Sequence, residues 1–167
     1  GLPSKQDQSR TNATCYDCHE AHNVGELGSI QRKEKRLKNP EVCGRCHEKQ
    51  LEEYRESDHG KAVLEKGDSD SAVCSDCHTT HKIASPEKDT VKLTITRNCG
   101  NCHEDAQRTY FASYHGQVHR LGYTNTAKCY DCHGSHKIKG EDDPTSEIHA
   151  NNRLENCRSC HEDANDN

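Results

Sequence analysis

The residues of this sequence that could do chemistry are its cysteines and histidines, which recur with one spacing. Two cysteines separated by two residues, with a histidine directly after the second, occur six times in 167 residues. In chain order the six motifs are Cys15, Cys18 and His19; Cys43, Cys46 and His47; Cys74, Cys77 and His78; Cys99, Cys102 and His103; Cys129, Cys132 and His133; and Cys157, Cys160 and His161. These motifs use all twelve cysteines, so no thiol is left for another role.

The Cys-x-x-Cys-His spacing suits one cofactor in particular. Two thiols three positions apart can both form thioethers to one porphyrin, and the histidine that follows can then bind the iron. A disulfide framework gives no reason for a histidine after every pair, and structural zinc does not require an invariable Cys-His dipeptide. A thioredoxin-like redox pair would need an alternating strand and helix pattern, which the sequence lacks. The motifs therefore predict six covalently attached haem c groups, held by all twelve cysteines, with the six motif histidines as proximal iron ligands.

The seven histidines outside the motifs are candidates for the distal iron ligands. The sequence contains no Met, so a second imidazole is the natural sixth ligand of each iron. Five of the seven recur in two patterns, Cys-His-x-x-His and Ser-x-His-Gly, and we predict that these five bind iron. They are His22, His81 and His136 in the first pattern, and His59 and His115 in the second. His119 and His149 both remain candidates for the sixth distal position, and we favour His149.

The chain is an internal repeat with a period near 56 residues. Tyr54 aligns with Tyr110 and His59 with His115, while the segment from Asp76 matches the segment from Asp131 with a shift of 55. Each copy carries one Cys-His-x-x-His motif and one Cys-His-Glu motif. We predict a single hexahaem domain over 1–167 made of three two-haem units, at about 11–66, 67–121 and 122–167. No third Ser-x-His-Gly segment follows the sixth motif, so the last unit is expected to take a ligand from His119 or His149.

Composition limits the fold class. Hydrophobic residues make up 29% of the chain and charged residues 31%, with one Phe and no Trp, so a core made of side chains alone is implausible. We predict a mostly irregular chain with short α-helices wrapped around six stacked haems, and little or no β-sheet. The expected elements are helices over 49–57 and 105–114, at most a short strand over 91–96, and loops over 23–40, 66–72 and 139–146.

Charge and hydropathy bear on location and partners. No stretch approaches the eighteen apolar residues of a membrane span, so we expect no transmembrane segment. A chain that starts at Gly1 and has no Met is expected to be a mature form whose export signal has been removed. We predict an exported protein, extracellular or at the cell surface, with the periplasm as the alternative. The net charge of -5 argues against nucleic acid and favours a redox partner with a basic face.

Three segments carry a family resemblance, namely Cys-Tyr-Asp-Cys-His-Glu-Ala-His, Cys-Ser-Asp-Cys-His-Thr-Thr-His and Ser-Asp-His-Gly. They resemble the motifs of bacterial and archaeal multihaem cytochromes c, over residues 15–161. Small all-histidine members of that group are periplasmic electron shuttles and subunits of extracellular conducting filaments. The resemblance implies electron transfer to redox partner proteins or extracellular electron acceptors. We favour a homopolymer with a head-to-tail contact that does not close, across which a distal histidine could be donated.

Two other functions stay open at this stage. A multihaem reductase needs an iron with an open or labile position, and the seven additional histidines argue against one, so we predict that the protein is not an enzyme. A haem-bearing structural or adhesive protein would share every motif and would differ only in slow or irreversible reduction.

Overall fold

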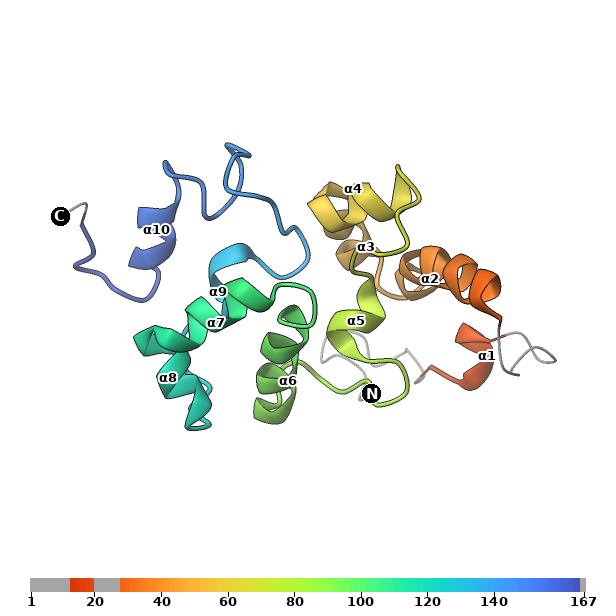
Figure 1. The fold of residues 1–167 in the computed structure, drawn as a ribbon, viewed down its shortest axis with the longest axis horizontal. Coiled ribbons are helices and arrows are strands. Elements are labelled where there is room, and N and C mark those ends of the chain that lie inside the picture. Colours follow the sequence, from red (N-terminus) through yellow and green to blue (C-terminus); the bar gives the residue numbers. More distant parts are fainter. Residues whose placement is uncertain (1–12, 20–27, 166–167) are drawn as a thin grey trace.

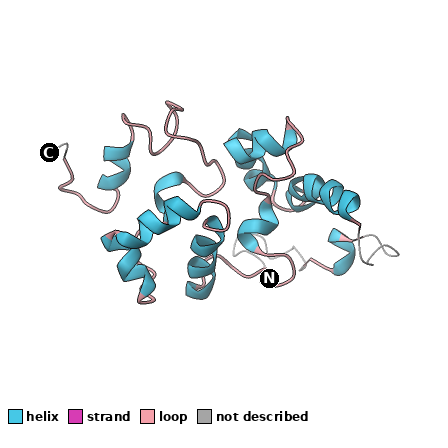
Figure 2. Ribbon diagram, in the orientation of Figure 1, coloured by secondary structure: helices cyan, strands magenta, loops and turns pink. Residues whose placement is uncertain are grey.

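The computed structural model describes residues 13–19 and 28–165. Within these residues the chain forms ten helices and no strand (Figures 1 and 2), which confirms the expected class of short helices in irregular chain without a sheet. Figure 1 shows the elements up to α5 at one end of the long axis and those from α6 onwards at the other. The helices are α1 (Cys15–Cys18), α2 (Ser29–Gly44), α3 (Glu48–Glu56), α4 (Asp58–Leu64), α5 (Cys74–His78), α6 (Asp89–Cys99), α7 (Glu104–Ala112), α8 (Tyr114–Arg120), α9 (Cys129–His133) and α10 (Arg153–Arg158).

The internal repeat is visible in the order of the helices. In each of the first two repeats a longer helix, α2 or α6, precedes a bent helix pair, and a short helix that carries a haem motif follows. The pairs are α3 with α4 and α7 with α8, and the short helices are α5 and α9. Contacts repeat as well, because α2 packs on α5 and α6 packs on α9.

Two expectations about secondary structure are wrong, and four are confirmed. Residues 91–96, expected as a strand, lie inside α6, and residues 29–40, expected as part of a loop, lie inside α2. In α6 the threonines that suggested a strand bond back to the helix, with Thr94 Oγ1 donating to the Thr90 carbonyl at 2.8 Å and Thr96 Oγ1 to the Lys92 carbonyl at 3.2 Å. The predicted helices 49–57 and 105–114 are α3 and α7, and 66–72 and 139–146 are irregular as expected.

The core formed by side chains is very small. Among the described residues Val63 and Val73 are the only buried hydrophobic residues, whereas Tyr114 and Leu121 are 78% and 88% exposed. Ordinary domains of this length bury about two thirds of their unfolded surface around a continuous apolar core. Contacts between apolar side chains are therefore not the main interaction that stabilises the described helices.

None of the described helices combines the length and the apolar character that a membrane span requires.

Candidate haem-binding site

The first, third and fifth motifs begin short helices on their first cysteine, and an aspartate inside each motif explains why. Its carboxylate accepts a hydrogen bond from the backbone N–H just before the helix, as in one half of a capping box. Asp17 accepts from Thr14 at 2.6 Å, Asp76 from Val73 at 2.7 Å and Asp131 from Lys128 at 2.8 Å. This bond holds the first turn, so both cysteines and the histidine are presented from one helical turn.

The second, fourth and sixth motifs are positioned at the other end of a helix. Cys43 lies near the end of α2 and Cys99 ends α6, while Cys157 is inside α10. The chain then turns, and His47 and His103 are the residues that precede α3 and α7. The second and fourth motifs therefore join a longer helix to the helix pair that carries the Ser-x-His-Gly segment.

The Ser-x-His-Gly segment is the bend between the two helices of each pair. The Ser57 hydroxyl accepts from the Gly60 N–H at 2.9 Å and donates to the Tyr54 carbonyl at 2.6 Å, so it caps α4 and ties it to the end of α3. Gly60 is required because a Cβ there would lie 2.6 Å from the carbonyl carbon of Tyr54. His59 is held between these two residues, which fixes where its ring emerges.

The second pair repeats this arrangement around His115. Ser113 accepts from the Gly116 N–H at 3.3 Å, and a Cβ at Gly116 would lie 2.6 Å from the Phe111 Cα. The tyrosine before each bend fastens the pair to the chain ahead of the next motif. Tyr54 donates to the Ala72 carbonyl at 2.8 Å, and Tyr110 donates to the Ala127 carbonyl at 2.9 Å.

The Cys-His-x-x-His segments turn sharply directly after the motif histidine. Thr79 has φ of 66° and Gly134 has φ of 78°, and both residues end a short motif helix. This left-handed conformation is common only for glycine, so Thr79 is strained. The turn redirects the chain, so that His81 and His136 point away from the motif helix that precedes them and lie near a different haem motif.

The structure places four motif histidines next to four of the predicted distal histidines. The ring centroids lie at 5.9 to 6.1 Å in every pair. The pairs are His19 with His81, His78 with His136, His103 with His59, and His161 with His115. Two imidazoles that bind one metal from opposite sides, through bonds of about 2 Å each, place their ring centroids about 6 Å apart. The four pairs therefore fit the axial ligands of haem iron.

One rule describes all four pairs. The distal histidine of a Cys-His-x-x-His segment faces the motif two places earlier, so His81 of the third motif meets the first motif. The distal histidine of a Ser-x-His-Gly segment faces the motif two places later, so His59, after the second motif, meets the fourth. Four chance aromatic contacts would not share one rule.

The surroundings of these histidines favour neutral rings. Burial lowers the pKa of His59 and of His78, and the imidazole opposite each of them lowers it further. The pKa of His133 is lowered chiefly by burial, with a contribution from His103. Neutral imidazole is the form that binds metal, so these positions are prepared for ligation.

Two motif histidines and one predicted distal ligand have no partner ring among the described residues. Within the described part of the chain neither His47 nor His133 has a ring facing it, and His149 has none either. His149 lies in the loop before α10, where its Nδ1 accepts from the Asn151 N–H at 3.2 Å. The predicted ligand His22 lies outside the described residues.

His119 is buried among other side chains of the protein. The residue is 3% exposed, and its Nδ1 lies 2.8 Å from the Tyr110 hydroxyl. With a shift of 56 residues His119 aligns with Val63, one of the two buried hydrophobic residues. His119 thus fills the core position of α8 that valine fills in α4.

The cysteines also show which motifs are neighbours. The Cys43 side chain lies against the Cys74 side chain, and the Cys99 side chain lies against that of Cys129. The second and third motifs therefore meet at their first cysteines, and so do the fourth and fifth.

Comparison with known proteins identifies a paired haem-attachment motif in the middle of the chain. Residues 62–108, which hold the third and fourth motifs, match the family model described as the doubled CXXCH motif. That segment therefore carries the paired attachment motif for covalent haem c that c-type cytochromes use. Comparison with curated proteins and with solved structures gave no match.

Proposed function

We propose that this protein transfers electrons through six covalently attached haem c groups, with histidine on both sides of each iron. The six Cys-x-x-Cys pairs would hold the porphyrins and the motif histidines would be proximal ligands. His81, His136, His59 and His115 would be the distal ligands of the first, third, fourth and sixth haems. The observation that carries this proposal is the set of four histidine pairs that follow one rule.

Bound haem supplies reversible one-electron chemistry at iron. The chain would do the rest: it fixes which motifs are neighbours, saturates the axial positions with imidazole and excludes other ligands. Cys43 beside Cys74 and Cys99 beside Cys129 support close spacing of the haems within the two central pairs. Only about 28 residues are present per motif, so little polypeptide is available to insulate one porphyrin from the next.

The pairing can be tested with His81→Ala. We expect this variant to keep six haems by intact mass while one becomes high-spin in its resonance Raman spectrum. The high-spin signal should disappear when the cysteines of the first motif are also replaced, and it should persist when those of the third motif are replaced. The opposite outcome would show that His81 serves its own motif and would refute the pairing.

We further propose that the protein is a subunit of an extracellular filament, built by head-to-tail contact of identical copies. Two relations among the described residues support this, because both can be extended to a neighbouring copy. The pairing rule calls for a Cys-His-x-x-His segment two motifs after His133, and the first such segment of a next copy carries His22. The contact between first cysteines would likewise set Cys157 against Cys15 of that copy. His149 would then remain for His47 of the first unit and not for the last unit as first expected, because His161 of the last unit faces His115.

Negative-stain electron microscopy of the native protein tests the filament. Filaments are expected for the unmodified protein and should be lost in His22→Ala, which should be a particle with six haems, one of them high-spin. The matched control is His119→Val, which should still polymerise. Small particles at all concentrations of the unmodified protein would contradict the filament and favour a periplasmic shuttle.

A multihaem reductase is the second candidate. The observation in its favour is that His47 and His133 have no facing ring among the described residues, which would suit an iron with an open position. An entirely low-spin resonance Raman spectrum of the assembled protein at room temperature would exclude it. A five-coordinate haem in that same preparation would support it.

A further inference from the structure

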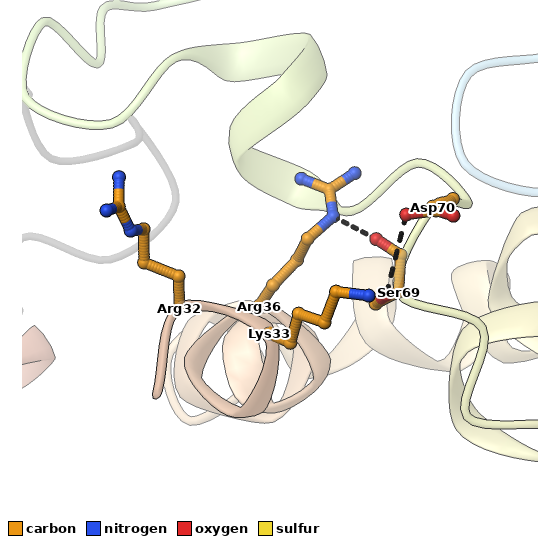
Figure 3. Close-up of a pocket in the computed structure, with 5 residues that line it drawn as sticks. All are labelled: Arg32, Lys33, Arg36, Ser69 and Asp70. Carbon is orange, nitrogen blue, oxygen red and sulfur yellow. Dashed lines mark hydrogen bonds between the residues drawn. The ribbon is translucent and has the colours of Figure 1, made fainter. Parts of the chain in front are cut away.

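Arg36 of α2 makes more polar contacts than any neighbouring side chain of that helix. Both of its terminal nitrogens bond the Asp76 carboxylate, at 2.8 and 2.7 Å. Its Nε donates to the Ser69 carbonyl at 2.5 Å, and one terminal nitrogen donates to the Ser71 carbonyl at 3.0 Å. Figure 3 shows Arg36 reaching from α2 to the turn at Ser69, with Arg32 one helical turn away. One cation thus joins the turn before the third motif to a carboxylate inside that motif.

The fifth motif has the same three acceptors but a different cation. With a shift of 55 residues, Ser69, Ser71 and Asp76 become Thr124, Thr126 and Asp131. The Lys128 ammonium donates to the Thr124 carbonyl at 3.0 Å and to the Thr126 carbonyl at 2.8 Å, and it pairs with the Asp131 carboxylate at 2.8 Å.

The two cations come from different elements of the fold. Arg36 lies on the long helix, and its counterpart on α6 is Lys92, which pairs with Asp89 at 3.4 Å instead. Lys128 lies directly before its motif, and its counterpart in the previous repeat is Val73. Val73 is 2% exposed and Lys128 is 6% exposed, so both occupy the same kind of buried position. The residue has changed between repeats while the positive charge and its three acceptors have been kept.

We propose that Arg36 and Lys128 are positioning residues of one repeated cation site, which fixes the haem motif that follows and sets the charge beside its haem. The inference rests on the proposed haem function. Asp76 lies between the two thioether cysteines of its motif, so its carboxylate is among the nearest charges to that haem. The cation neutralises this carboxylate and satisfies two turn carbonyls. Without it, the uncompensated negative charge favours oxidised iron and lowers the reduction potential of that haem.

The test moves the charge from one element to the other. Arg36→Met should lower the midpoint potential of one haem and reduce haem loading of the peptide that contains Cys74 and Cys77, measured by mass after proteolysis. Adding Val73→Lys recreates the arrangement of the fifth motif and should restore both. Arg36→Lys should keep most of the loading. Arg32→Met removes the same charge from the same helix and should change neither quantity.

The outcomes separate this inference from the proposed function. If the unmodified protein lacks haem at the third motif, the proposed function fails. If the unmodified protein is loaded and Arg36→Met matches it in potential and loading, the cation site is refuted. If Arg36→Met does not accumulate, recovery in the double variant with Val73→Lys supports the site, and failure to recover overturns it. Lys128→Met should shift the potential of one haem in the same direction.

Discussion

Replacing Gly60 by Ala should disconnect one haem from its distal ligand. The added Cβ would lie 2.6 Å from the carbonyl carbon of Tyr54, whereas carbon atoms pack at about 3.5–4.0 Å, so α4 must move away from α3 by about 1 Å. His59 moves with it, and a metal–imidazole bond of about 2 Å tolerates only about 0.2 Å. We therefore expect the His59 ring to leave the line to His103. Overpacking of this kind also costs about 1–3 kcal/mol of unfolding free energy.

Resonance Raman and denaturant unfolding of the loaded protein measure the two effects separately. Gly60→Ala should show one high-spin haem, assigned to the fourth motif because removal of that motif's cysteines abolishes the signal. Gly140→Ala is the matched control, since its Cβ would meet nothing closer than the Asp58 Oδ2 at 3.4 Å. The reasoning would be refuted if Gly60→Ala retained wholly low-spin haem and the stability of the control.

Four further substitutions test the turns and the remaining histidines. Thr79→Gly should raise the melting temperature, because relief of a left-handed threonine is worth about 1–3 kcal/mol and glycine returns only about 0.5–1 kcal/mol of that. Gly134→Thr should lower it, and a change of the same sign in both variants would contradict the strain. His119→Val should leave every haem low-spin, since the His119 ring occupies in α8 the core position that Val63 occupies in α4. His149→Ala should produce one high-spin haem by resonance Raman, and an unchanged spectrum would remove His149 from the ligand set.

The motifs and the candidate ligands could be predicted from the sequence because they depend on local chemistry. Two thiols and an imidazole at fixed spacing act within one turn of chain, so spacing alone identifies them. The repeat then singled out His59 and His115 through their matching surroundings. Helices α3 and α7 were predictable for a similar reason, since their composition favours helix throughout.

The pairing of the ligands could not be predicted, because it is a property of tertiary packing. Nothing within the segment around His81 indicates that its ring faces His19, about sixty residues earlier in the chain. The helical state of residues 91–96 was missed because a run of β-branched residues favours a strand. In the structure the threonine hydroxyls of this run bond back to carbonyls of the same helix. Arg36 and Lys128 were missed since they share no aligned position. The aspartate at the same place in three motifs was the one available signal of that site.

The pairing of histidines makes each two-motif unit depend on its neighbours. Each of the four observed pairs joins a motif of one two-motif unit to a histidine of the neighbouring unit. His78 and His103 of the middle unit face His136 and His59, which belong to the units on either side. In repeat proteins stability is the sum of unit terms and nearest-neighbour terms. Here the bonds between iron and the histidines of a neighbouring unit would supply the nearest-neighbour term. No unit alone could then provide both axial ligands for its haems. An outer unit would then present an iron whose axial ligation only a further unit could complete, and in the proposed filament an identical copy would supply that unit.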